Sequence, residues 1–212
     1  MKITNSYELL VFLKSLGYLQ NPPHPLWWPN AGNFEVVLGA IFVQNTKWEQ
    51  AFKVLSRLKD KGILSLEALA NVSHTNLEIL MSDLGFFRQK AQRSIKLCQN
   101  ILEEFGNFEN FCENVDREWL LAQKGIGNET CDSILCYGAL RDEMVADKYS
   151  YKLLKSFGYE LESYEEIKEW LKEGVLENFT KVCELYGYEI SLNTLYARFH
   201  GKIVEFCKIQ KF

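Results

Sequence analysis

The chain has 212 residues, 47% hydrophobic and 14% aromatic, which is enough for one large or two small domains around a packed core. Its net charge of −4 argues against a protein that coats polyanions indiscriminately, although a local basic face is possible. Apolar runs such as Val36–Val43 are too short to span a bilayer, and the chain does not open with a basic segment followed by an apolar one. We therefore expect a cytoplasmic protein with no membrane partner.

The cysteines give no sign of a disulfide framework or a metal site. They form no C-x-x-C pair and have no His partner at zinc spacing. We expect buried, reduced thiols, with no metal and no cofactor. The six cysteines are Cys98, Cys112, Cys131, Cys136, Cys183 and Cys207.

In chain order, the first half of the sequence is mostly helical by periodicity. A first helix ends at Gly17, and the apolar segment 33–44 could be a helix or a strand by periodicity alone. Thr46 and Glu49 have capping-box spacing at the start of a helix that ends at Gly62. Two short helices follow.

The rest of the chain continues the helical pattern. The two short helices are separated near Val72 and Ser73, and the longer amphipathic helix after them ends at Gly106. Further helices extend to the C-terminus, and no convincing run of alternating strand residues occurs. The predicted fold class is all-α.

A glycine hairpin lies between two of these helices, in the sequence Lys124-Gly125-Ile126-Gly127. Both glycines permit positive φ values, so successive backbone N–H groups at the start of the next helix can point outward together and bind a phosphate. The alternative is a tight corner between two helices.

Four segments together resemble the helix-hairpin-helix DNA glycosylases related to endonuclease III, from about residue 31 to residue 157. They are GAIFVQNTKWEQA, LGFFRQKAQRSIKLC, KGIGNETCDSILCYGAL and MVADKYSYKLL. The resemblance implies that Gln44 fills the gap left by an extruded nucleotide, that the hairpin binds DNA and that Asp147 is the catalytic aspartate.

Two departures from the family pattern carry information. Family members that also cleave the strand have a lysine nucleophile eighteen positions before the aspartate, where this chain has Glu129. The resemblance therefore implies a monofunctional enzyme, and a solvated first-turn role for Glu129 is compatible with this. Only Cys183 and Cys207 occur in the last thirty residues, so we expect no iron–sulfur cluster.

The implied chemistry favours a base that is already charged. Breaking the bond between the base and the sugar builds positive charge on the sugar, which an ionised Asp147 would stabilise while aligning a water. An ionised carboxylate cannot protonate the leaving base. Alkylated purines such as 3-methyladenine carry the charge themselves, so double-stranded DNA containing alkylated bases is the expected partner.

The segment NPPHPLWWPNAGNF suggests a pocket for the base. Trp27, Trp28 and Pro29 resemble the corresponding segment of the 3-methyladenine DNA glycosylase III subgroup, and an indole over an electron-poor base gains cation–π attraction. The alternative is that both tryptophans only seal a junction between lobes. Further candidates for the pocket are Trp48, Lys202 and Lys208. The alternative for Trp48 is ordinary core packing, and the alternative for the two lysines is a position on the surface.

A basic run offers local contacts with the DNA backbone. Lys90, Arg93 and Lys96 share one side of the predicted helix, and Lys124 adds charge at the hairpin. We expect phosphate contact at the Lys90 end, although a solvated charged face is the common outcome for such a run.

The expected architecture has two helical lobes with an active-site cleft between them, in a monomer. One lobe is a helical barrel of residues 31–138, and residues 1–30 and 139–212 form the other. Two other functions are considered: a non-catalytic hairpin protein that only binds DNA, and a glycosylase of the same fold for mismatched or oxidised bases.

Overall fold

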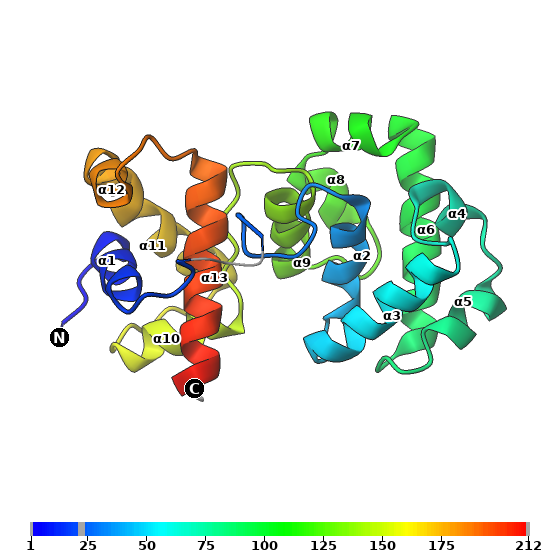
Figure 1. Cartoon of the computed structure of the whole chain (residues 1–212), viewed down its shortest axis with the longest axis horizontal. Coiled ribbons are helices and arrows are strands. Elements are labelled where there is room, and N and C mark those ends of the chain that lie inside the picture. Colours follow the sequence, from blue (N-terminus) through cyan, green and yellow to red (C-terminus); the bar gives the residue numbers. More distant parts are fainter. Residues whose placement is uncertain (1, 21–23, 211–212) are drawn as a thin grey trace. The chain divides into compact units, whose positions relative to one another are not determined.

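The computed structural model describes residues 2–20 and 24–210, and helices are the only regular elements found among them. The all-α prediction is confirmed. None of the described helices has both the length and the apolar character that crossing a membrane requires. The chain divides into two compact units (Figure 1). We call Asn30–Leu140 the hairpin unit, and the described residues up to Pro29 and from Arg141 onward the terminal unit.

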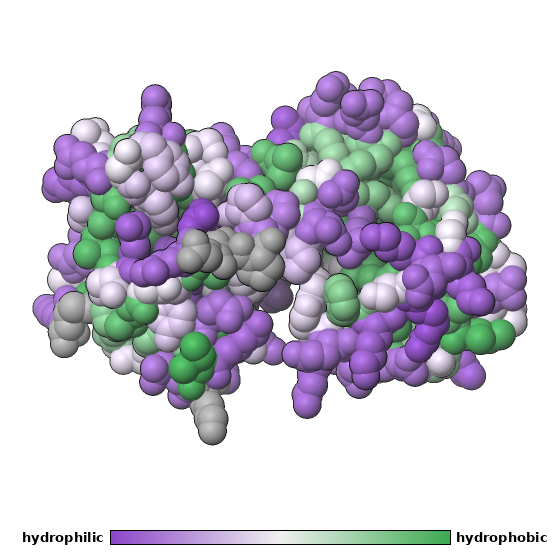
Figure 2. Space-filling view, viewed as in Figure 1, coloured by the Kyte–Doolittle hydropathy of each residue, from purple (hydrophilic) through white to green (hydrophobic). Residues whose placement is uncertain are grey.

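The hairpin unit begins with α2 and ends with a π-helical turn, η1. In chain order its elements are α2 (Phe34–Phe42), α3 (Trp48–Asp60), α4 (Leu66–Asn71), α5 (His74–Leu80), α6 (Phe87–Phe105), α7 (Phe108–Asn114), α8 (Arg117–Ala122), α9 (Asn128–Ser133) and η1 (Ile134–Gly138). Figure 2 shows hydrophilic residues along the outer edge of this unit above α7 and hydrophobic residues just below that edge, as expected for a helix that turns one stripe toward a core.

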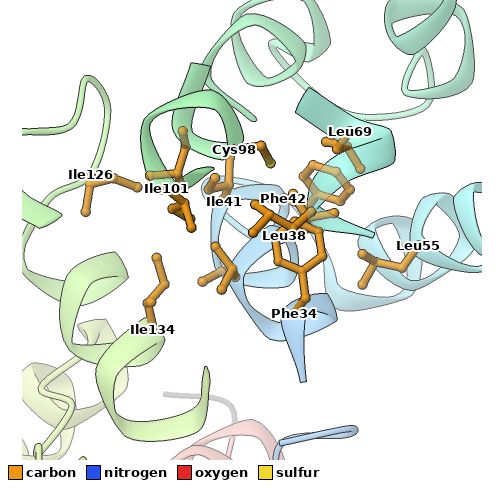
Figure 3. Close-up of a cluster of buried hydrophobic side chains, with 14 of the residues drawn as sticks. Phe34, Leu38, Ile41, Phe42, Leu55, Leu69, Cys98, Ile101, Ile126 and Ile134 are labelled. Atoms are coloured by element: carbon orange, nitrogen blue, oxygen red, sulfur yellow. The ribbon is translucent and has the colours of Figure 1, made fainter. Parts of the chain in front are cut away.

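Helix α2 forms the centre of this unit because it is apolar on nearly every side. All its residues except Glu35 are buried, and it packs against α3, α6, α9 and η1. The close-up in Figure 3 shows Leu38, Ile41 and Phe42 of α2 pointing toward side chains of the surrounding helices. A helix with so little polar surface is stable only inside a core.

The predicted helix boundaries in this unit are partly confirmed. The long helix α6 ends at Gly106, which has a φ of 79°, and two short helices flank Val72 and Ser73 as predicted. The predicted capping box is wrong, because α3 begins at Trp48 with Lys47 as its N-cap residue and no side-chain cap.

The terminal unit is built around α13, the long helix shown in red in Figure 1. Helices α1 and α10 both pack against α13, and α1 also packs against α11. Buried side chains of these helices form a second hydrophobic core, which shares no residue with the core of the hairpin unit. The elements are α1 (Ser6–Ser15), α10 (Lys148–Ser156), α11 (Tyr164–Glu177), α12 (Phe179–Tyr186) and α13 (Leu192–Gln210).

A single glycine permits the close approach of α1 and α11. A methyl group built on Gly174 would lie 2.8 Å from the backbone nitrogen of Ser6 and 2.7 Å from its hydroxyl oxygen. That hydroxyl also accepts a hydrogen bond from the backbone N–H of Val175, at 3.0 Å. The contact therefore leaves no room for a side chain on α11 at this point.

Replacing Gly174 with alanine should destabilise the protein. Alanine gains about 1 kcal/mol in helix propensity, but forcing a methyl group against backbone costs about 1–3 kcal/mol. We expect a net loss in the free energy of unfolding, measured by urea denaturation. Glu173→Ala, at the exposed neighbouring position, is the matched control and should not be destabilised. A more stable Gly174→Ala variant would contradict the packing argument.

Candidate functional site

The glycine hairpin lies where the sequence predicted it, between α8 and α9. Gly125 has a φ of +87°, whereas Gly127 is the N-cap of α9 in extended backbone with a φ of −102°. Only the first glycine therefore needs the left-handed region, contrary to the expectation for both. The side chain of Ile126 is buried in the hydrophobic core and anchors the turn, while Lys124 is exposed.

Gly125 has a second role, because an arginine side chain lies across it. A methyl group built on Gly125 would lie 2.5 to 2.7 Å from Cδ, Nε and Cζ of Arg93 in α6. Within the described part of the chain, the guanidinium of Arg93 forms no hydrogen bond or ion pair. The hairpin therefore carries a cation beside its backbone without a carboxylate to neutralise it.

The side chain of Gln44 is attached to the same hairpin. Its amide nitrogen donates to the carbonyl oxygen of Gly125 at 3.0 Å and to the hydroxyl of Thr130 at 2.9 Å. Asn45, the next residue, has a φ of +51°, so the chain turns sharply after Gln44. The structure thus places Gln44, Arg93 and the hairpin in one group.

Lys90 does not have the position that was predicted for it. Its side chain is buried, and its ammonium donates to the carbonyl oxygens of Phe42 and Gln44 at 2.8 and 2.9 Å and to the Thr46 hydroxyl at 2.7 Å. Burial lowers the pKa of Lys90 to about 8. The predicted phosphate contact by Lys90 is therefore wrong: the residue holds the loop that carries Gln44, and Thr46 serves as its acceptor rather than as a helix cap.

Trp48 and Glu129 lie at the starts of their helices. Trp48 is the first residue of α3, half-buried, with its ring 6.2 Å from that of Phe52. Glu129 is exposed in the first turn of α9, where a negative charge is favoured by the helix dipole.

In the terminal unit, Asp147 is the N-cap of α10 and is only 8% exposed. Its Oδ1 accepts hydrogen bonds from the backbone N–H groups of Tyr149 and Ser150, at 3.0 and 2.9 Å, and from the Ser150 hydroxyl at 3.2 Å. Its Oδ2 faces Nε2 of His200 in α13, at 3.6 Å. One oxygen therefore caps the helix, and the other faces the imidazole.

The carboxyl group of Asp147 is held in its ionised form. Burial raises the pKa of Asp147, but the polar contact with His200, the electrostatic interaction with that side chain and the hydrogen bonds from Ser150 together outweigh burial. The resulting pKa lies below the usual value for aspartate. At neutral pH the group is a buried anion.

Trp27 packs onto α13 against His200, the residue that faces this carboxylate. Its indole N–H donates to Oε1 of Glu205 at 3.1 Å, and its ring meets that of His200 edge to face at 5.4 Å. A methyl group built on Gly201 would lie 2.6 Å from the indole, so the helix must have glycine there. The ammonium of Lys208 lies 5.9 Å from the centre of the indole and 3.5 Å from Glu205.

The remaining predicted pocket residues lie in the same unit, in different environments. Trp28 is buried with its ring edge to face against Trp27 at 6.1 Å, and Pro29 is half-buried. Lys202 is almost fully buried, and its ammonium donates to the carbonyl oxygen of Tyr18 at 2.8 Å. Burial, with the charges of two nearby basic residues, lowers the pKa of Lys202 to about 8. The first three residues of the segment that contains the tryptophans, 21–23, lie outside the described residues.

Sequence reasoning missed three members of this group on α13: His200, Gly201 and Glu205. The available signal was the sequence HGKIVE, in which the histidine and glycine are adjacent and the glutamate follows one turn later. Among the described residues, no three His, Cys, Asp or Glu side chains are grouped so that they could hold a metal ion.

Comparisons with known proteins agree on one family. A family model described as "HhH-GPD superfamily base excision DNA repair protein" matches residues 38–177. The crystal structure of a 3-methyladenine DNA glycosylase (MagIII) from H. pylori, bound to 1,N6-ethenoadenine, is 48% identical, covers 99% of each chain and has a TM-score of 0.94. A trapped endonuclease III–DNA covalent intermediate, 16% identical over 98% of this chain and 88% of that one, has the same fold, with a TM-score of 0.73.

A curated relative covers nearly the whole chain. It is MJ1434 of Methanocaldococcus jannaschii, provisionally named a DNA repair glycosylase, and it is 33% identical over 96% of this chain and 89% of its own length. Together with the family match over most of the sequence, these likenesses show that the chain belongs to the HhH-GPD superfamily of base excision DNA repair proteins.

Proposed function

We propose that this protein is a monofunctional DNA glycosylase that removes alkylated purines, chiefly 3-methyladenine, from double-stranded DNA by hydrolysing the N-glycosidic bond. The observation that carries this proposal is a buried, ionised Asp147 that faces His200, the residue against which the indole of Trp27 packs. The likeness to a 3-methyladenine glycosylase that binds 1,N6-ethenoadenine supports the choice of substrate. The protein would act as a monomer on chromosomal DNA in the cytoplasm.

Asp147 would lower the barrier by stabilising charge on the sugar. As the bond to the base breaks, positive charge develops at C1′ of the deoxyribose. A carboxylate about 4 Å away stabilises a unit charge by roughly 4 kcal/mol at the effective dielectric of a protein surface. The same carboxylate can orient the attacking water. Because it stays ionised, it has no proton to give to the leaving base.

Because Asp147 cannot protonate the leaving base, the expected substrate is a base that leaves without acid assistance. An N-alkylated purine such as 3-methyladenine is cationic before the bond breaks, so it leaves as a neutral base without acid assistance. A cation also gains up to about 2 kcal/mol over a desolvated indole, which would favour it over normal bases. Trp27 packs against His200, the residue that faces Asp147, and Trp28 packs edge to face against Trp27.

Converting Asp147 to asparagine should abolish base release and leave DNA binding intact. The amide is uncharged, and losing one such electrostatic contact costs on the order of 10²- to 10³-fold in rate. Single-turnover release of methylated purine from alkylated duplex measures the effect, with the dissociation constant for the same duplex as a second readout. Asp142→Asn, at an exposed position in the same unit, is the matched control and should keep the wild-type rate. Wild-type release by Asp147→Asn would contradict the assignment.

The enzyme should release the base without cleaving the strand. Strand cleavage begins with an amine that forms a Schiff base with the sugar, and Glu129 occupies the position where related lyases have lysine. Borohydride added during turnover should therefore trap no covalent protein–DNA adduct, while the abasic product accumulates. An endonuclease III-type lyase on its own substrate is the positive control. A trapped adduct that disappears in Lys148→Ala would show that this neighbouring amine performs the attack.

The hairpin unit would bind the DNA backbone. Backbone N–H groups at the hairpin, Lys124 and the guanidinium of Arg93 offer phosphate contacts, and Gln44 would enter the stack in place of the extruded nucleotide. In this proposal Arg93 makes the phosphate contact that the sequence suggested for Lys90.

Arg93→Ala should weaken binding to any duplex by about fivefold and reduce the slope of log affinity against log salt by about one. A titration of labelled duplex at several salt concentrations measures both quantities. Arg88→Ala, on the same helix but exposed and near Glu78, is the matched control and should keep the wild-type slope. An unchanged slope in Arg93→Ala would show that this guanidinium contacts no phosphate.

A further inference from the structure

The two oxygens of the Asp147 carboxylate have different environments. Three donors from the first turn of α10 converge on Oδ1, which makes that oxygen part of the helix cap. The group that faces Oδ2 comes from another element, α13, and it is the imidazole of His200 at 3.6 Å. A distance of 3.6 Å is an electrostatic contact rather than a short hydrogen bond.

His200 is fixed in place by its surroundings. It is 3% exposed, in the middle of the longest helix of the terminal unit. The indole of Trp27 packs against it with the ring planes at 88°, and Gly201 keeps that indole close to the helix. The imidazole therefore cannot swing away from Asp147 without displacing Trp27.

We propose that His200 is a positioning residue for Asp147, which holds Oδ2 oriented and ionised for base release. This inference rests on the proposed glycosylase function. Oδ1 is committed to capping α10, so Oδ2 is the oxygen left to face the sugar and the attacking water. His200 is the side chain that controls it.

Burial explains why the carboxylate needs such a neighbour. Taking a carboxylate out of water favours its protonated form, and a protonated Asp147 could neither stabilise charge at C1′ nor accept a proton from water. The donors of α10 counter this at Oδ1 only. Without His200, a proton could settle on Oδ2 while the helix cap stayed intact.

Other charged groups around the pair do not replace His200. From α13, Cys207 lies near Asp147, but burial, followed by the charge of Asp147, raises the pKa of this thiol to about 12, so it stays neutral. Glu205 and Lys208 of α13 pair with each other one to two turns further on. The charge of Lys152 in α10 lowers the pKa of the Cys207 thiol, and the group that Trp27 places against His200 is an uncharged indole.

The test is the pH dependence of single-turnover release of methylated purine in His200 variants. Between about pH 5.5 and 8, the wild-type rate should vary little, because the pKa of Asp147 is held below the usual range. In His200→Leu, no imidazole opposes the effect of burial, so the pKa of Asp147 should rise. The release rate should then be at least tenfold lower at the acid end of that pH range than at its upper end. His200→Gln, which places an amide N–H near the position of Nε2, should recover most of the wild-type profile.

Cys207→Ala controls for packing defects, since it removes a buried side chain from the same helix near the same carboxylate. Its profile should keep the wild-type shape. A His200→Leu profile parallel to wild type at every pH, merely lower or unchanged, would overturn the inference. If the wild-type protein released no methylated purine at all, the proposed function itself would fail instead.

Should His200→Leu not fold, two measurements on His200→Phe decide the matter, because phenylalanine keeps an aromatic ring against Trp27 but has no N–H to face Oδ2 of Asp147. Asp147 contributes stability above its unfolded pKa, and this is lost as pH falls through the lowered folded pKa. In urea unfolding, His200→Phe should lose that contribution at a higher pH than wild type, and its release rate should begin to fall at a higher pH. Wild-type behaviour in both measurements would overturn the inference.

Discussion

The site depends on one buried carboxylate that serves two elements at once. Asp147 caps α10 with one oxygen and meets α13 with the other, so the start of one helix and the middle of another fix it from two sides. A carboxylate in this place is costly to bury unless it is compensated, and the compensation here comes from backbone N–H groups and an imidazole rather than from a lysine or arginine. Among the described residues, the anion is thus stabilised without an ion pair to lysine or arginine.

The aromatic group that packs beside His200 comes from a part of the chain far from α13 in sequence. Trp27 reaches α13 only because position 201 has no side chain, and Glu205 then fixes the indole by accepting its N–H. Trp27 itself has a φ of +73°, an uncommon conformation for a bulky residue. Strain of this kind persists where surrounding contacts over-determine it, and here those contacts hold the indole against His200, the residue that faces Asp147.

Much of the fold could be predicted from the sequence because it depends on local chemistry. Periodicity gave the helices, Gly106 marked the end of α6, and the hairpin glycines marked the turn between α8 and α9. Two predictions on side chains were wrong for a common reason. The sequence shows that Lys90 is a cation and Thr46 a possible cap, but not that folding brings the ammonium to that hydroxyl. His200 was missed because a lone histidine in an apolar helix is more often an ordinary core residue.

The buried ammonium of Lys90 also bears on how the enzyme could be engineered. Burial lowers the pKa of this ammonium to about 8, so burial disfavours the charged form, and the three hydrogen bonds that it donates to Phe42, Gln44 and Thr46 offset that cost. What the charge provides is the shape of the loop that presents Gln44. A nonpolar side chain at position 90 would leave those three oxygen acceptors without their donor, so redesign of the core for thermal stability should retain this lysine.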